Sequence, residues 1–228
     1  MPTTATFHFQ QLLEREPTHY DALARLIDLL RRAGKLSMCP KFLEQSAKAT
    51  TRTNEPGLNF CKGLYHRFLG EANQAVRCFN LARRDSTFGV RALENMIELS
   101  LFPDGTIGGS FSEETTTVEP DQFQENLLRA NTLLNELDTN PNRDPTRTRV
   151  LAAYALVATK NKSNMERAME DFESIVKDEN EHVGALLGLA QCQKELGQVN
   201  KARNSLKRIK ALPVSSCGWE PGGGGGGG

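Results

Sequence analysis

Two segments of this 228-residue chain carry small and large side chains at the same spacing, and this shared spacing constrains the fold more than any other feature. In both segments the successive residues are separated by 7, 5, 4 and 3 positions. The two sets are Gly63, Gly70, Ala75, Phe79 and Ala82, and Ala190, Gly197, Ala202, Leu206 and Ile209. Intervals of 3, 4 and 7 place side chains on one face of an α-helix, whereas in a β-strand every second residue lies on the same face. The chain is therefore predicted to repeat a pair of helices.

These intervals are typical of the tetratricopeptide repeat, a helix–turn–helix unit of about 34 residues. The predicted fold is all-α, a tetratricopeptide-repeat solenoid of antiparallel helix pairs, with about eleven helices and no sheet. The predicted repeats begin at Tyr20, Pro56, Val90, Arg149 and Val183.

Each position of the pattern has a predicted packing role. Gly34, Gly70 and Gly197 are expected in the turn between the helices of a repeat, where glycine adopts a left-handed backbone at low cost, and Ser163 is expected there in the repeat from Arg149. Small side chains let two helices approach, and large ones fill the space between them. The predicted small positions are Gly63, Ala75, Ala82, Ala168, Ala190 and Ala202, and the large ones are Phe79, Phe172 and Leu206.

The predicted organisation has seven segments. Residues 1–19 form a partial repeat, and 20–102 form two repeats and the first helix of a third. Pro103 ends that helix, and residues 103–120 are an inserted loop whose four acids and absence of Lys and Arg give it a charge of −4. The second helix of the third repeat occupies 121–139, a Pro- and Asn-rich connection 140–148, two further repeats 149–216, and a disordered glycine-rich tail 217–228. We expect the loop to be dispensable for folding.

Composition argues against several classes of partner. The charges of the 28 basic and 28 acidic residues cancel, so the net charge of the chain does not attract the phosphates of a nucleic acid. No apolar run is long enough to cross a bilayer, and the N-terminal residues do not form a signal peptide, which predicts a cytoplasmic protein without membrane insertion. The five cysteines form no C-x-x-C pair and are expected to be reduced.

Motifs for catalysis are missing from the sequence. It contains no phosphate-binding loop, no dinucleotide fingerprint, no H-E-x-x-H and no G-x-S-x-G. The four histidines lie in separate predicted helices or turns, so none is expected to share a metal ion with another. We therefore expect no enzymatic activity, no cofactor and no metal site.

The predicted binding surface is the groove lined by the first helix of each repeat. In this repeat family the groove-facing residues lie at the second, fifth, ninth, twelfth and thirteenth positions. They are Asp28, Arg31, Arg32, Phe60, Leu64, Arg67, Phe68, Lys160, Gln191 and Lys194.

The last predicted helix carries five cations, Lys201, Arg203, Lys207, Arg208 and Lys210. A solvated outer face is the favoured interpretation of this helix, and docking of an acidic partner is the alternative.

Five strings of residues resemble one family specifically. They run over residues 26–36, 40–44, 55–65, 79–85 and 92–99, and they are similar to the C-terminal half of the tetratricopeptide repeat protein 21 family. Members of that family are much longer, so this resemblance suggests a fragment. It implies a subunit of intraflagellar transport complex A, located in the cytoplasm and in the cilium at the axoneme and ciliary base.

The resemblance also implies partners. These are other protein subunits of complex A, with ciliary membrane-protein cargo and, indirectly, the retrograde dynein motor. The implied role is non-enzymatic scaffolding in retrograde transport, cilium assembly and protein localisation to cilia. The alternative is a co-chaperone-like adaptor that binds peptides in the cytosol. That class needs a lysine and an asparagine at the fifth and ninth positions, where the first repeat has Ala24 and Asp28.

Overall fold

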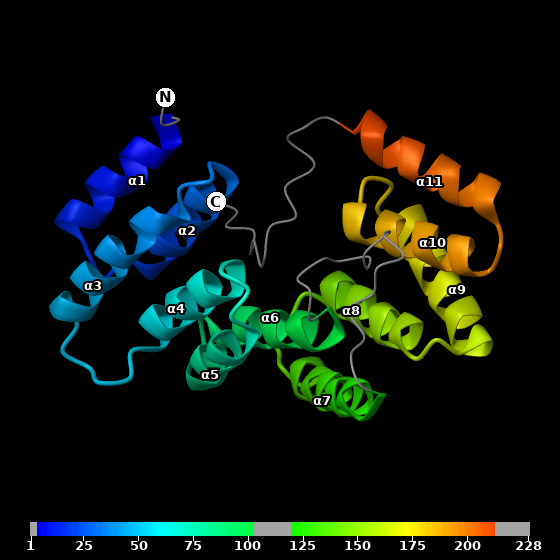
Figure 1. Cartoon of the computed structure of the whole chain (residues 1–228), viewed down its shortest axis with the longest axis horizontal. Coiled ribbons are helices and arrows are strands. Elements are labelled where there is room, and N and C mark those ends of the chain that lie inside the picture. The colour runs from blue at the N-terminus through cyan, green and yellow to red at the C-terminus, as the bar shows by residue number, and fades with distance from the viewer. Residues whose placement is uncertain (1–3, 103–119, 213–228) are drawn as a thin grey trace. The chain divides into compact units, whose positions relative to one another are not determined.

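A computed structural model describes residues 4–102 and 120–212, and this part of the chain folds into eleven α-helices and one short 3-10 helix (Figure 1). The all-helical prediction is confirmed. The helices are α1 (Thr4–Arg15), α2 (Tyr20–Arg32), η1 (Leu36–Met38), α3 (Cys39–Ala49), α4 (Pro56–Phe68), α5 (Ala72–Ala82), α6 (Gly89–Leu101), α7 (Pro120–Asp138), α8 (Pro145–Ala158), α9 (Lys162–Asp178), α10 (Val183–Glu195) and α11 (Val199–Ala211). The chain divides into a first unit, residues 1–93, and a second unit, residues 94–228, and the boundary lies within α6.

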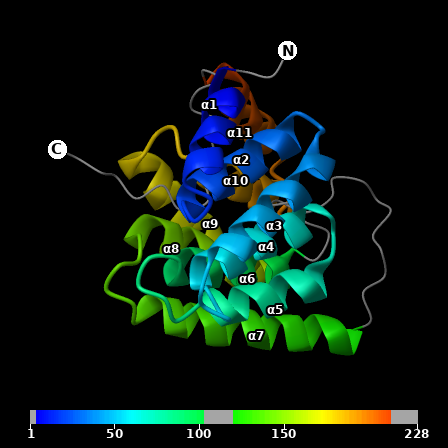
Figure 2. The same ribbon diagram turned by 90° about the vertical axis from the view of Figure 1, so that its left-hand side faces the viewer.

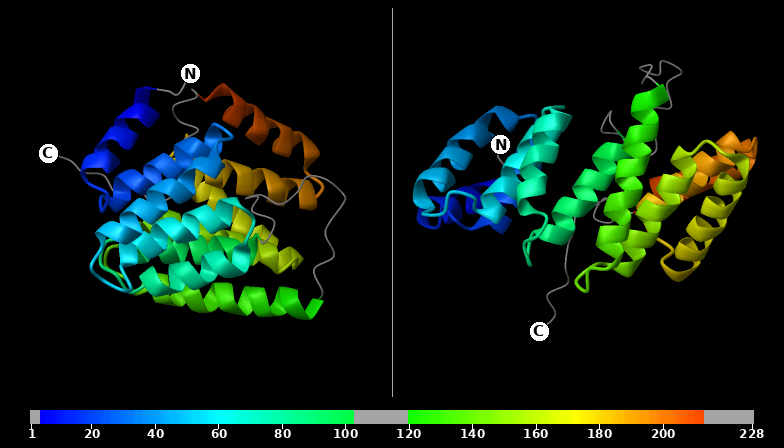
Figure 3. Two further views of the ribbon diagram at one scale, coloured as in Figure 1. Left: turned by 60° about the vertical axis from the view of Figure 1, so that its left-hand side comes forward. Right: turned by 90° about the horizontal axis from the view of Figure 1, so that it is seen from below.

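The first unit is built from helices that pack on their neighbours in sequence. Figure 3 shows α4 and α5 side by side as an antiparallel pair, and α2 packs against both α1 and α4. Pro56 supplies the preset backbone angle for the first turn of α4. The imidazole of His19 accepts a hydrogen bond from the backbone N–H of Ala22 at 3.2 Å and so caps α2.

The second unit pairs α8 with α9 and α10 with α11. The 19-residue α7 lies along α8 (Figure 2). Asp144 caps α8 by accepting hydrogen bonds from the backbone N–H groups of Thr146 and Arg147. His182 caps α10 in the same way as His19 caps α2, with 3.1 Å to the backbone nitrogen of Ala185.

Close helix packing rests on contacts between glycines and aromatic rings. A Cβ atom at Gly63 would lie 2.5 Å from the ring of Phe79, and one at Gly188 would lie 2.3 Å from the ring of Phe172. Both rings are fully buried. Gly63 and Phe79 belong to the predicted small–large set, whereas Gly188 does not, because the repeat pattern assigns the small position to Ala190.

The described turns after α2, α4 and α10 adopt the predicted left-handed backbone. Gly34, Gly70 and Gly197 have φ angles of +66°, +80° and +75°. In the fourth repeat this conformation belongs to Lys160, with φ +54°, and not to Ser163. The helix of that repeat accordingly begins at Pro145, so its predicted start at Arg149 is wrong, and the predicted connection 140–148 ends at Asp144.

One predicted packing residue is exposed. Leu206 was assigned to the space between helices, but 37% of its surface is accessible, and α11 packs on α10 through Ala202 and Ser205. Ile209 is half-buried, whereas the predicted small residues and the rings of Phe79 and Phe172 are buried.

Some predictions lie outside the described residues. These are the properties of the loop predicted at 103–120, of which only Pro120 is described, at the start of α7, and of the tail at 217–228. Among the helices that are described, none combines the length and apolar character that crossing a bilayer requires.

Candidate protein-binding site

The carboxyl-terminal ends of α2 and α4 bring four predicted groove residues together in the first unit. Asp28 forms salt bridges with Arg31 and Arg32, at 3.0 Å and 2.8 Å from its two carboxylate oxygens. The guanidinium carbon of Arg31 lies 4.7 Å from the ring centre of Phe68, which links α2 to α4. We call these four residues the α2–α4 cluster.

The α2–α4 cluster is accessible and carries a surplus of positive charge. The side chains of Arg31 and Arg32 are 44% and 48% exposed, and one carboxylate serves both. Asp28 and the Phe68 ring fix the plane of the Arg31 guanidinium. A guanidinium held in this way can bind an acidic side chain of a partner or pack on an aromatic one. Arg67, another predicted groove residue, is half-buried in the last turn of α4.

Two predicted groove residues belong to the core instead. Phe60 and Leu64 are 0% and 2% exposed. The Phe60 ring packs against Phe79 at 5.8 Å and Phe88 at 5.5 Å between ring centres, and the guanidinium of Arg91 covers it at 4.6 Å. Their predicted exposure in the groove is wrong, because α4 packs against α2 and α5.

The structure shows an ion pair that the sequence analysis missed. Arg91 at the start of α6 donates to the carboxylate of Asp21 on α2 at 2.7 Å. Gly57 on α4 lies near the same place, where a Cβ atom would meet the rings of Tyr20 and Phe88 at less than 3 Å. The available signal was the opposite charges at the second positions of the predicted first and third repeats.

The predicted groove residues of the second unit do not form a comparable cluster. Lys160 lies in the turn after α8, not on its face, and its ammonium lies 5.5 Å from the ring centre of Phe123. Gln191 is half-buried on α10, and Lys194 is exposed one turn later.

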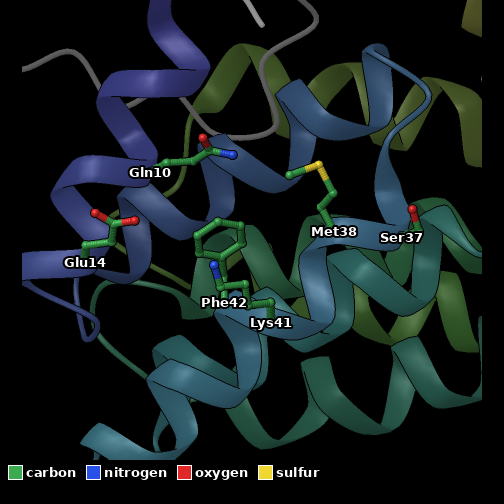
Figure 4. Close-up of a pocket in the computed structure, with 6 residues that line it drawn as sticks. All are labelled: Gln10, Glu14, Ser37, Met38, Lys41 and Phe42. Carbon is green, nitrogen blue, oxygen red and sulfur yellow. The ribbon is translucent and has the colours of Figure 1, made fainter.

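A small hollow of about 230 Å³ lies between α1, η1 and α3 (Figure 4). Its lining residues are Gln10, Glu14, Ser37, Met38, Lys41 and Phe42. Met38 and Phe42 supply an apolar surface, while Glu14 and Lys41 supply one charge of each sign. The hollow is large enough for one side chain of a partner and was not predicted.

The thiols of the described residues are in environments that disfavour reaction. Burial raises the pKa of Cys39 to about 11 and that of Cys192 to about 12, and it raises the pKa of Cys61 further. Since the thiolate is the nucleophile and the metal ligand, these cysteines act as buried apolar side chains. Within the described ranges no group of three His, Cys, Asp or Glu side chains has metal-site geometry.

Comparison with known proteins identifies two consecutive domains of one family. Residues 2–101 match the TT21 fifth ARM repeats domain, and residues 129–220 match the tetratricopeptide repeat protein 21 C-terminal ARM domain. Tetratricopeptide repeat protein 21B of Homo sapiens is 45% identical over 198 residues, covering 83% of this chain and 15% of that protein. Tetratricopeptide repeat protein 21A of Homo sapiens is 37% identical over 212 residues, covering 90% of this chain and 16% of that protein.

A more distant relative matches at least as much of the chain. The tetratricopeptide repeat protein 21 homolog of Caenorhabditis elegans is 31% identical over 219 residues, covering 90% of this chain and 16% of that protein. A solved structure with TPR-like repeats from Podosopora anserina superposes with a TM-score of 0.48 at 18% identity, covering 86% of this chain and 95% of that chain. The chain thus spans about 15% of the length of its curated relatives. With both family domains present in order, the chain belongs to the tetratricopeptide repeat protein 21 family.

Proposed function

We propose that this chain is a non-enzymatic scaffold segment of an intraflagellar transport complex A subunit. In this role it acts in retrograde ciliary transport, cilium assembly and the localisation of proteins to cilia. The observation that carries the proposal is family membership, with 45% identity to a human member over 198 residues. The corresponding location is the cytoplasm and the cilium.

The α2–α4 cluster supplies the chemistry of partner recognition in this proposal. The exposed Arg31 guanidinium lies over the half-buried ring of Phe68, and Arg and aromatic residues are enriched among the residues that dominate protein interfaces. The proposed partners are other complex A subunits. Ciliary membrane-protein cargo and the dynein motor would connect to the chain through those subunits.

A co-chaperone-like adaptor has less support. Such an adaptor grips a terminal carboxylate with a lysine at the fifth position of its first repeat, and this chain has Ala24 there, which is buried. A non-enzymatic role is further supported by the burial that raises the pKa of Cys39, Cys61 and Cys192.

Affinity purification from ciliated cells tests the proposal. A tagged full-length protein that carries this segment is compared with the same protein lacking it, and co-purified proteins are quantified by mass spectrometry. We expect complex A subunits to be enriched with the intact protein and depleted when the segment is removed. Unchanged recovery of every subunit would contradict the proposal, and a switch to chaperones as the lost partners would favour the adaptor.

A further inference from the structure

Helix α11 exposes apolar side chains at one edge. Val199 is 49% exposed and Leu206 is 37% exposed, although the repeat pattern predicts that Leu206 is packed. Ala202 and Ser205 face α10, and the Ser205 hydroxyl donates to Oε1 of Gln193 at 3.0 Å. Figure 1 shows α11 lying on α10, and within residues 4–102 and 120–212 no other helix packs extensively on α11.

The exposed apolar residues alternate with cations along the helix. Val199, Arg203, Leu206 and Lys210 follow one another at intervals of 4, 3 and 4 residues, which places them on a single edge of α11. Arg203 and Lys210 are both exposed. We call these four residues the α11 stripe. Alternation of this kind is the pattern by which one helix recognises another, with apolar side chains in the contact and charges beside it.

The charge of α11 differs from that of an ordinary solvated helix. Its 13 residues include five cations and no acid, whereas the neighbouring α9 carries both signs along its length. Arg208 donates to the backbone oxygen of Asn180 at 3.3 Å, on the edge opposite the stripe. Within the described part of the chain, no carboxylate forms a salt bridge with Arg203 or Lys210. Arg203 and Lys207, four residues apart, place like charges side by side, which weakens a helix that has no counter-charge.

We propose that the α11 stripe binds an acidic amphipathic helix of a partner protein. Val199 and Leu206 contact its apolar face, while Arg203 and Lys210 pair with carboxylates along its edge. The apolar contact supplies the burial, and the charges select an acidic partner and fix its register. This inference does not depend on the ciliary role proposed above.

The composition of α11 favours a protein helix over a membrane or a nucleic acid. Helices that lie on membranes expose a broad apolar face with Trp, Phe or Leu, whereas α11 has no aromatic residue and uses Ala202 against α10. A phosphate-binding face would place cations, not Val199 and Leu206, along its centre. Both alternatives are outcomes of the test below.

A designed peptide serves as the probe. It is a fluorescein-labelled helix of about 18 residues with leucine at the a and d positions of each heptad and glutamate beside them. The matched peptide has lysine in place of every glutamate. Fluorescence anisotropy with the complete 228-residue chain measures both dissociation constants. We expect the acidic peptide to bind more tightly than the lysine peptide by at least about tenfold, and more tightly at low salt than at high salt.

Two pairs of charge reversals on the same helix separate the stripe from a general charge effect. Arg203→Glu with Lys210→Glu changes the stripe, while Lys201→Glu with Arg208→Glu makes the same change of net charge on the opposite edge. The first pair should weaken binding of the acidic peptide by about tenfold or more, and the control pair by about twofold or less. Leu206→Ser should also weaken binding, because the contact is partly apolar. Circular dichroism of every variant checks that the chain remains helical.

Three results would overturn the proposal. The first is equal affinity for the acidic and lysine peptides, or no measurable binding of either. The second is an equal loss for the two reversal pairs, which would indicate a diffuse electrostatic effect. The third is tighter binding to phosphatidylserine vesicles or to a DNA duplex than to the acidic peptide, when this tighter binding is weakened only by the substitutions in the stripe.

Discussion

Glycine residues in two helices leave room for the phenylalanine rings packed against them. At Gly63 and Gly188 the closest ring atom would approach an added Cβ to 2.5 Å and 2.3 Å, closer than van der Waals contact allows. Phe79 and Phe172 are fully buried, so neither ring can move into solvent without losing its packing. At this scale a single methyl group is enough to disturb the contact between two helices.

Gly63→Ala should therefore lower the free energy of unfolding, by about 1–3 kcal/mol, although alanine favours helix over glycine by about 1 kcal/mol. Urea unfolding followed by circular dichroism measures the change. In the background of Phe79→Leu the same substitution should cost less, because the smaller side chain relieves the clash. Equal or greater stability of Gly63→Ala in the unmodified chain would contradict the close contact.

The sequence spacing predicted most of the positions where the two helices of a repeat pack against each other. It did not predict which other faces of a helix are covered by the next repeat. Asp28, Arg31 and Phe68 lie together on the surface, whereas Phe60 and Leu64, from the same predicted groove positions, are buried. The difference arises because Phe88 and Arg91, which lie about thirty residues further along the chain, cover Phe60. A repeat pattern describes a single repeat and its helical period, so it does not contain such contacts between successive repeats.

At the scale of single elements, α8 shows how a repeat can differ from its pattern. Its left-handed turn residue is Lys160, where α2, α4 and α10 are followed by a left-handed glycine, and the helix begins at Pro145. The expected start at Arg149 came from counting back 34 residues from the next repeat. The 17-residue α9 is longer than α5 or α11, so this repeat exceeds the regular length and counting failed.

Lys160→Gly should stabilise the turn after α8. Glycine adopts a φ near +54° without the steric cost of a Cβ atom, which is about 1 kcal/mol for other residues. Lys160→Ala is the matched control, since it also removes the ammonium near the Phe123 ring but keeps the Cβ atom. Thermal unfolding should rank the glycine variant above the alanine variant. The opposite order would show that the backbone at this position is not left-handed.

The contact between α6 and α8 depends on a buried ion cluster that the sequence analysis did not predict. Nη2 of Arg147 donates to Oε1 of Glu98, and its Nε lies 3.9 Å from Oε2 of Glu94. All three side chains are buried. Glutamates inside a helix are commonly solvated, so their sequence positions gave no sign of this arrangement.

Replacing Arg147 by leucine should destabilise the second unit strongly, by about 3–5 kcal/mol, because two carboxylates would remain buried without their cation. Arg149→Leu is the control two residues away. That side chain is 46% exposed and lies 3.9 Å from Asp178, so its removal should change stability by about 1 kcal/mol or less. Urea unfolding of both variants measures the difference. A loss of about 1 kcal/mol or less for Arg147→Leu would contradict this account of the buried cluster.

At the scale of the whole molecule, the chain is electrically neutral but its charges are segregated. The 28 cations and 28 anions cancel, yet residues 101–148 include nine acids and three bases, and α11 has cations only. Selection of a partner by charge is therefore expected to depend on local surfaces and not on the net charge of the molecule. The helical fold and the family could be predicted from the sequence. The α2–α4 cluster and the α11 stripe required the structure, because the exposure of a charged side chain decides whether it can contact a partner.

Direct binding of the purified 228-residue chain to purified complex A subunits tests the central claim of a protein-binding scaffold. The test variant is Arg31→Glu with Phe68→Ala in the α2–α4 cluster. The control is Arg77→Glu with Leu81→Ala, which makes a similar change on the exposed face of α5. Biolayer interferometry should show that the unmodified chain and the control bind at least one subunit with the same affinity, while the cluster variant binds about tenfold more weakly. Failure of the unmodified chain to bind any subunit, or equal binding by both variants, would contradict the account.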